Sequence, residues 1–190
     1  MKPNTRYWAT IVMALVATAP ALRADDAPGV RAVAFSPDGE RLAVTTGEPK
    51  QPGTVTLWDV ATRKQVWKHN EAGGVPAVAF SPDGKSLAIG VYDNTARLLD
   101  AGTGQVVKSL AHPKEVRAVA FSPDGKLLAT ACWDKLVRVW DLVDGAEKRT
   151  FSGHKDRIFA VEFSADGKLL LSVGGDDGAK LWDEIGRAHV

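Results

Sequence analysis

Short apolar and β-branched segments alternate with turn residues from about residue 30 to residue 183. In one of them, residues 116–121 read Val-Arg-Ala-Val-Ala-Phe, and a second apolar segment begins at Lys126 after the turn Ser-Pro-Asp-Gly. Proline presets φ at the second turn position, and glycine accepts the positive φ at the end of the turn. This pattern predicts a β-hairpin.

Two further turns in the same unit predict two further strands. Residues 133–135 precede the apolar segment 136–140, and Asp144-Gly145 precedes a weaker strand that ends near Phe151. The unit therefore holds four strands in about 41 residues. Because these strands do not alternate cleanly between apolar and polar residues, both faces of the sheet are expected to be covered. The pattern predicts an all-β fold.

This unit is written four times along the chain. Phe-Ser-Pro-Asp-Gly begins at Phe35, Phe80 and Phe121, and Phe-Ser-Ala-Asp-Gly begins at Phe163. A second landmark follows each copy, at Trp58-Asp59, Leu99-Asp100, Trp140-Asp141 and Trp182-Asp183. The first unit carries extra residues, which we place between Thr46 and Gly53. The repeats are expected at about 25–68, 69–110, 111–151 and 152–183.

Radial repetition of four-stranded sheets is the architecture of a β-propeller. The fourth unit, with Gly153-His154, Asp176 and Trp182-Asp183, resembles a WD-repeat propeller unit, and the resemblance extends from Val30 to Asp183. It implies four four-stranded blades, the last of them incomplete, in an open partial ring, because the family normally closes with around seven blades. It also implies a scaffold that presents loops to protein partners.

The first 24 residues have the three-part layout of a secretory signal peptide. Lys2 and Arg6 precede an apolar run at residues 7–19, and small residues around Ala21 and Ala24 offer cleavage sites, of which Ala21 is preferred. The run is shorter than the ~20 residues that a membrane-spanning helix needs. An uncleaved N-terminal anchor is the alternative. In both cases the rest of the chain is expected to be exported, to the periplasm or the medium, with no other membrane association.

Composition and charge argue against nucleic acid as a partner. The chain has 190 residues, 45% of them hydrophobic and 25% charged, with 24 Lys and Arg against 23 Asp and Glu. The first 24 residues hold three of the cationic residues and no acidic one, so the remainder has a formal net charge of 21 − 23 = −2. A general nucleic-acid binder would show a clear positive excess.

The third and fourth units each contain a hydroxyl, an imidazole and a carboxylate, which could form a catalytic triad. Because the set is repeated, we instead interpret it as structural. In the family that the sequence resembles, these positions form a buried hydrogen-bond chain from His through Ser or Thr to Trp, with Asp fixing the imidazole. The two sets are His112, Thr130, Asp134 and Trp140, and His154, Ser172, Asp176 and Trp182.

The first two units lack most of this set. In the second unit Glu71 replaces the His, Ile89 the hydroxyl residue and Leu99 the Trp, so that only Asp93 remains, with His69 two residues out of register. The first unit has Trp58, no His, and Pro52 at the Asp position. We therefore expect the third and fourth units to be the more rigid pair.

No cofactor, metal or catalytic residue is predicted. The single cysteine, Cys132, has no partner thiol and is expected to be a small buried residue. The acidic segment Gly174–Gly178 aligns with the turn at residues 133–135, so it is expected to be a turn rather than a metal loop.

The partner surface that the resemblance implies consists of loop residues at one rim of the propeller. Arginine and aromatic residues, the types that contribute most to interface energies, are frequent among them. A solvated rim without a dedicated partner is the alternative. The predicted rim residues are Arg31, Tyr92, Glu115, Arg117, Trp133, Arg157 and Phe159, and the insertion at residues 47–53 belongs to the same rim.

The last unit stops at Asp183, before a fourth strand, and residues 184–190 are similar to the translation of a sequencing-library adapter. We therefore expect a non-native tail and a truncated chain. The sequence predicts an exported, non-enzymatic scaffold for protein interaction. One alternative is the propeller domain of a larger exported redox or hydrolytic enzyme. Another is self-association through open blade edges, in which two four-bladed arcs complete a ring of eight.

Overall fold

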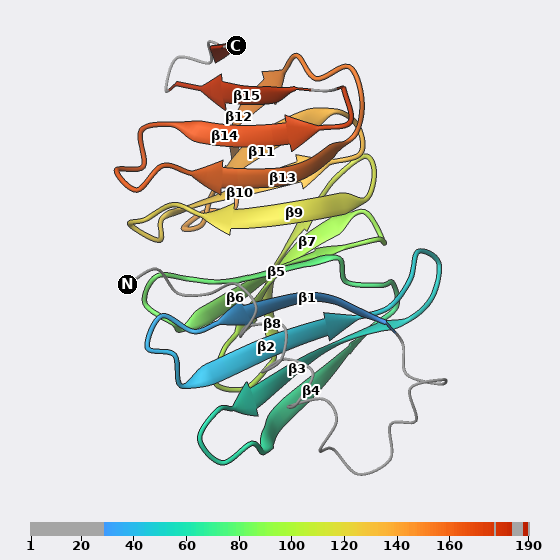
Figure 1. Ribbon diagram of the computed structural model, residues 1–190, viewed down its shortest axis with the longest axis vertical. Coiled ribbons are helices and arrows are strands. Elements are labelled where there is room, and N and C mark those ends of the chain that lie inside the picture. Colours follow the sequence, from blue (N-terminus) through green and yellow to red (C-terminus); the bar gives the residue numbers. More distant parts are fainter. Residues whose placement is uncertain (1–28, 177, 184–187, 190) are drawn as a thin grey trace, which may run out of the picture.

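The computed structural model describes residues 29–176, 178–183 and 188–189, and the secondary structure of this part consists of β-strands (Figure 1). The predicted signal segment and most of the predicted tail lie outside the described residues.

The strands fall into four groups of four, which we call blades 1 to 4. Blade 1 contains β1 (Val30–Phe35), β2 (Arg41–Thr46), β3 (Gly53–Asp59) and β4 (Gln65–Glu71). Blade 2 contains β5 (Ala77–Phe80), β6 (Ser86–Val91), β7 (Thr95–Asp100) and β8 (Val106–Ala111). Blade 3 contains β9 (Val116–Phe121), β10 (Leu127–Cys132), β11 (Leu136–Asp141) and β12 (Glu147–Ser152). Blade 4 contains β13 (Ile158–Phe163), β14 (Leu170–Gly174), β15 (Ala179–Trp182) and β16 (Ala188–His189).

Each blade is an antiparallel sheet whose strands pair in chain order. The first strands of successive blades contact one another, β1 with β5, β5 with β9 and β9 with β13. Figure 1 shows these four strands following one another from the lower to the upper part of the molecule. The all-β propeller architecture with four blades is therefore confirmed, and the ring is open.

The turn between the first two strands of each blade explains why Ser-Pro-Asp-Gly recurs. In blade 3 the Ser122 hydroxyl donates to Asp124 Oδ1 at 2.6 Å, and Asp124 Oδ1 accepts the Lys126 N–H at 3.1 Å. Gly125 has a φ of 71°, in the left-handed region that glycine adopts without strain. Blade 4 has Ala165 at the proline position, yet its turn makes the same serine–aspartate bond at 2.6 Å. The serine, aspartate and glycine therefore hold the turn without proline.

Three apolar clusters join the four blades. Between blades 3 and 4, Ala129 and Ala131 of β10 are fully buried against Ile158 and Trp182. Equivalent clusters join blade 1 to blade 2 and blade 2 to blade 3. Strand β10 is buried on both faces for this reason, which is why its sequence does not alternate between apolar and polar residues.

The insertion in blade 1 lies where the sequence placed it, since β2 ends at Thr46 and β3 begins at Gly53. It packs against the segment that enters blade 2. A Cβ atom on Gly74 would lie 2.4 Å from the Gly47 carbonyl oxygen, so only a glycine fits at this crossing. The insertion is thereby fixed to the second blade by backbone contact.

Blade 4 differs from the expectation that it ends at its third strand. A two-residue strand, β16, pairs with β15, with Ala188 opposite Trp182 and His189 opposite Leu181. This pairing partly covers the edge that β15 would otherwise expose. The origin of residues 184–190 stays a prediction. The first blade also ends slightly later than expected, because β4 continues to Glu71 rather than ending at residue 68.

In the part of the chain that the model describes, no helix is long and apolar enough to cross a membrane.

Candidate functional site: a cation–aromatic rim

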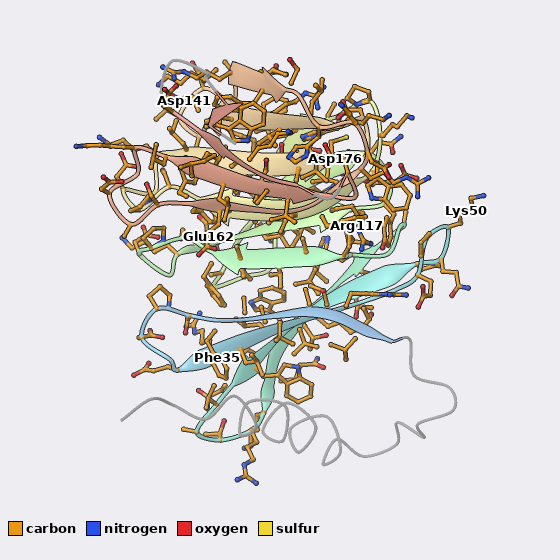
Figure 2. The ribbon with its side chains drawn as sticks, turned by 45° about the horizontal axis from the view of Figure 1, so that its top comes forward. Phe35, Lys50, Arg117, Asp141, Glu162 and Asp176 are labelled. Atoms are coloured by element: carbon orange, nitrogen blue, oxygen red, sulfur yellow. The ribbon has the colours of Figure 1, made fainter. Side chains whose placement is uncertain are left out.

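The two ends of the blades differ in the chemistry that they present. Figure 2 shows Arg117, Asp176 and Lys50 at one end of the sheets, and Phe35 and Asp141 at the other. The first end, which we call the rim, carries the starts of the first strands and the turns between the second and third strands. The predicted partner residues belong to this end.

Four of the seven predicted residues form one continuous cluster, which we call the rim cluster: Tyr92, Arg117, Trp133 and Arg157. Arg117 Nη1 donates to the Tyr92 hydroxyl, and the Arg117 guanidinium carbon lies 5.4 Å from the Tyr92 ring centre and 5.7 Å from that of Trp133. The Arg157 guanidinium carbon lies 4.2 Å from the centre of the same Trp133 ring. The rim cluster thus crosses blades 2, 3 and 4.

The backbone positions the aromatic residues of this cluster. The Trp133 N–H donates to the Glu115 carbonyl at 3.0 Å, and the Tyr92 N–H donates in the same way to the Gly74 carbonyl at 2.9 Å. Each turn is thereby attached to the segment that enters its own blade. Glu115, another predicted rim residue, therefore contributes its carbonyl oxygen to the site.

The two arginines of the rim cluster have no carboxylate partner among the residues that the structure describes. Among the described residues, no Asp or Glu oxygen lies within 4.0 Å of the guanidinium of Arg117 or Arg157. Within the same part of the chain, Arg117 Nε and Trp133 Nε1 are buried without a hydrogen-bond acceptor. Buried donors of this kind are costly when they stay unpaired.

A cavity of about 360 Å³ opens beside the Trp133 ring. Its wall combines the blade 2 turn, the segment that enters blade 3, and the start of blade 4. The lining residues are Asn94, Pro113, Lys114, Glu115, Trp133 and Arg157. Larger and smaller cavities at the opposite end of the blades lack the stacked arginines.

The other predicted rim residues lie apart from the cluster. Arg31 forms an ion pair with Glu48 of the insertion and donates from Nε to the Gly47 carbonyl at 3.2 Å, so its charge is already neutralised. Phe159, on β13, is 48% exposed. The sequence placed both residues at the correct end of the blades, but the tertiary structure does not bring them to Trp133.

The predicted hydrogen-bond chain of blade 3 is present in part. His112 Nε2 lies 2.8 Å from Thr130 Oγ1, and Trp140 Nε1 donates to the same oxygen at 3.0 Å. His112 Nδ1 donates to the Leu110 carbonyl at 3.0 Å, so Nε2 is the acceptor and the Thr130 hydroxyl donates to it. All three side chains are buried.

Asp134 does not fix the imidazole of His112, contrary to the expectation. Its carboxylate forms an ion pair with Arg138 at 2.7 Å instead. The arginine stands four residues later, is 7% exposed, and offers a rigid fork of donors that holds a carboxylate strongly. The carboxylate of Asp134 therefore pairs with Arg138 rather than with His112.

Blade 4 has the complete chain. Trp182 Nε1 donates to Ser172 Oγ at 2.8 Å, and Ser172 Oγ lies 2.8 Å from His154 Nε2. His154 Nδ1 donates to Asp176 Oδ1 at 2.8 Å. Lys180 replaces the arginine of blade 3 here, which leaves the aspartate free for the imidazole. Hydrogen bonds from the Lys155 N–H and His154 lower the pKa of Asp176 to about 2.

Blade 2 replaces this chain with an ion network that the sequence reasoning missed. Arg97 donates to Glu71 Oε2 at 2.8 Å and to Asp93 Oδ2 at 2.6 Å. His69 Nε2 lies 3.1 Å from the other Glu71 oxygen, and Glu71 is 6% exposed. The sequence does contain a signal for these ion pairs. In blades 2 and 3, an arginine stands four residues after the aspartate.

Burial determines the ionisation of two residues in blade 3. Desolvation lowers the pKa of His112 to about 4, so the imidazole is neutral at physiological pH. Desolvation also raises the pKa of Cys132 to about 11, and its thiol donates to the Lys114 carbonyl at 3.2 Å. Cys132 is fully buried, as expected. A protonated, buried thiol of this kind is unreactive.

The described residues contain no group of three or more His, Cys, Asp or Glu side chains placed to hold a metal ion. In the acidic segment, Gly174 is the last residue of β14. Asp176 of the same segment accepts a hydrogen bond from His154.

Four-stranded meanders in radial sequence, with repeated His–hydroxyl–Trp chains, define blades of a WD-type β-propeller. The model of the WD domain, G-beta repeat, matches residues 20–59, 104–141 and 145–183. The chain therefore belongs to the WD-repeat family. The model of the anaphase-promoting complex subunit 4 WD40 domain matches residues 56–115. No curated protein matches the chain. WD repeats generally mediate protein–protein interaction or scaffolding.

Proposed function

We propose that this chain is a protein-interaction scaffold without chemistry of its own, and that the rim cluster is its partner-binding surface. The observation that carries the proposal is the group of Arg117, Trp133 and Arg157, in which two guanidinium groups lie over one indole ring and pair with no carboxylate of the described residues. Tryptophan and arginine are the residue types that most often dominate binding energies.

The charge of the rim cluster favours an acidic segment as the partner. Lys114 and Lys155 are exposed beside the arginines. The carboxylates of Asp134 and Asp176 are already engaged by Arg138 and His154. Two further acidic residues, Glu115 and Asp156, leave the two arginines and two lysines in excess. A glutamate or aspartate of the partner would meet two planar guanidinium groups, which bind carboxylates through paired hydrogen bonds. The cavity beside Trp133 offers space for such a side chain.

The buried hydroxyls support a structural rather than a catalytic role for the His chains. Thr130 and Ser172 have no exposed surface, and each lies between an imidazole and an indole. A nucleophile must reach the substrate, which these oxygens cannot do without opening the blade. This argument disfavours a catalytic triad at either His chain.

Binding of an acidic peptide tests the partner surface. A fluorescein-labelled peptide of alternating glutamate and glycine is expected to bind, as measured by fluorescence anisotropy, and Arg157→Gln is expected to weaken binding about tenfold, because one charge-assisted contact of about 1.5 kcal/mol is lost. Affinity should fall as salt is raised.

The matched control is Arg149→Gln on β12, because Arg149 is an exposed arginine outside the rim cluster. It should bind as the wild type does. Equal weakening by both substitutions would show binding by overall charge and contradict the assignment. A single-stranded oligonucleotide that binds as tightly as the acidic peptide would contradict the choice of a protein partner.

We also propose that the chain is exported. The support is the cationic start, the apolar run and the small residues within residues 1–24. After expression in a host with a secretory pathway, mass spectrometry of the isolated protein should show a chain that begins at Leu22 or Asp25. A chain that retains residues 1–24 and stays in the cytosol would contradict this proposal.

A further inference from the structure

The grooves between neighbouring blades differ at the end opposite the rim, where Figure 2 shows Asp141. Between blades 1 and 2, Trp67 of β4 occupies the groove, and its indole Nε1 donates to the Ala101 carbonyl at 3.0 Å. A Cβ atom on Gly104 of the adjoining turn would lie 2.8 Å from the indole ring, so the ring packs directly on the turn. Arg41 Nη1 donates to the same carbonyl at 3.2 Å. Blade 1 thus covers its junction with blade 2 by means of its own side chains.

Between blades 2 and 3, the equivalent positions hold smaller side chains. In the register of the sheets, Lys108 stands at the position of Trp67, and Ser86 stands at that of Arg41. The Lys108 amine still bonds to the next blade, since it donates to the Leu142 carbonyl at 3.0 Å. A lysine and a serine fill less space than an indole and an arginine, so this groove stays open.

The open groove has a volume of about 610 Å³ and an apolar wall. We call it the blade 2–3 groove; its apolar and cationic lining consists of Leu98, Val107, Lys108, Phe121, Leu142 and Val143. Val107 and Val143 are 61% and 86% exposed. At the junction of blades 1 and 2 the remaining cavity is about 390 Å³, and the equivalents of Leu98 and Val107 do not line it. Exposed apolar side chains around an open groove are typical of a binding site.

The polar groups of the blade 2–3 groove are complementary to an indole. The carboxylates of Asp83 and Asp124 and the Leu142 carbonyl are hydrogen-bond acceptors, and an indole offers a donor and no acceptor. The Lys108 ammonium also lines the groove, and it is attracted to the negative face of an aromatic ring. Because the Ala101 carbonyl accepts two side-chain donors, the Leu142 carbonyl can accept an indole N–H beside the lysine.

We propose that the blade 2–3 groove binds a tryptophan side chain presented by an extended segment of a protein partner. The chain itself provides the precedent, because Trp67 occupies the equivalent groove between blades 1 and 2. Apolar residues beside the tryptophan of the partner cover Val107 and Val143. Strand β8, which carries Val107, is the outermost strand of its sheet, so an extended segment can lie along it. The site is separate from the rim cluster and does not depend on the function proposed for it.

NMR titration of the ¹⁵N-labelled full chain with the peptide acetyl-Gly-Val-Trp-Val-Gly-amide tests the site. The amide signals of Val107, Lys108 and Val143 are expected to shift. Replacing the tryptophan of the peptide by alanine should weaken binding at least about tenfold, because the buried indole supplies most of the apolar contact. An absence of these shifts, shifts confined to the rim cluster, or equal binding of the alanine peptide would contradict the proposal.

Substitutions in the chain test the same assignment. Lys108→Trp reproduces the filled groove of blade 1, so it should weaken binding of the peptide at least about tenfold. Val107→Ser removes an exposed apolar contact and should weaken binding about fivefold. The matched control is Val66→Ser, at the equivalent position beside the groove that Trp67 occupies, and it should leave the affinity unchanged. Both valines are exposed, so the two serine variants should keep the far-UV circular dichroism of the wild type.

Further controls separate this site from other modes of binding. Arg157→Gln should not change the affinity for the tryptophan peptide, because the blade 2–3 groove is independent of the rim cluster. Equal weakening by Val107→Ser and Val66→Ser, or wild-type binding by a folded Lys108→Trp variant, would overturn the assignment. Light scattering measures the mass of the full chain. A dimeric wild type that Val107→Ser converts into a monomer would place a second copy in the groove and would equally refute the proposal.

Discussion

Thr130→Val is expected to lower the free energy of unfolding by about 2–4 kcal/mol, because it leaves two buried groups, His112 Nε2 and Trp140 Nε1, without their shared partner. Valine has nearly the shape of threonine, so the packing of β10 is retained and the loss reports the hydrogen bonds. Urea unfolding followed by tryptophan fluorescence measures the change.

Thr150→Val is the matched control, since Thr150 is exposed in the same blade. Its effect should stay within about 0.5 kcal/mol. A second test uses Trp140→Phe, which removes the indole N–H. In that background Thr130→Val should cost about 1 kcal/mol less, because only the imidazole then loses a partner. Additive effects would mean that the three side chains do not act as one network.

Acidification should reduce the stability of the protein between pH 6.5 and pH 4. The pKa of His112 is lowered to about 4 in the fold, whereas an unfolded histidine has its ordinary value of 6.5. The unfolded state therefore binds the proton first as pH falls, so the contribution of the neutral imidazole is complete above pH 6.5 and is lost toward pH 4. The shift corresponds to about 3 kcal/mol.

Carboxylates act in a lower range of pH. Hydrogen bonds from the preceding serine hydroxyls lower the pKa of Asp83 and Asp124 below 3.8, so their contributions are present above that pH and are lost below it. Chemical denaturation at several pH values should therefore show His112→Gln with a flatter profile than the wild type between pH 6.5 and pH 4. A direct check is the NMR titration of the imidazole, and a midpoint near 6.5 in the folded protein would contradict the prediction.

The repeated motifs made the fold predictable. Each Ser-Pro-Asp-Gly turn and each Trp-Asp or Leu-Asp pair stands at a fixed place in a meander of four strands, and residues equivalent in the repeats occupy equivalent positions in the sheets. The hydrogen-bond chains of blades 3 and 4 could be predicted from the sequence for the same reason. His154, Ser172 and Trp182 come together because the register of the blade is fixed, and β14 and β15 place Leu170 opposite Trp182.

The aspartates were harder to predict because two partners compete for them. Asp134 and Asp176 are equivalent in sequence, yet one binds Arg138 and the other His154. The outcome depends on one side chain four residues away, arginine in blade 3 and lysine in blade 4. A motif that names only the His, the hydroxyl, the Asp and the Trp omits this competitor. The same omission concealed the buried Glu71–Arg97 pair of blade 2.

The resemblance to the WD-repeat family implied the end of the blades at which Arg117, Trp133 and Arg157 lie. The sequence by itself determined the repeated β-unit and its turns. These features depend on local conformational preference and on alternation along a strand, which the chain carries within each repeat. Only the tertiary structure decided that Arg157 stacks on Trp133 while Arg31 pairs with Glu48. The first contact joins blades 3 and 4, and the second joins β1 to the insertion of the same blade. Both distances depend on how the segments pack rather than on the spacing of residues in the sequence.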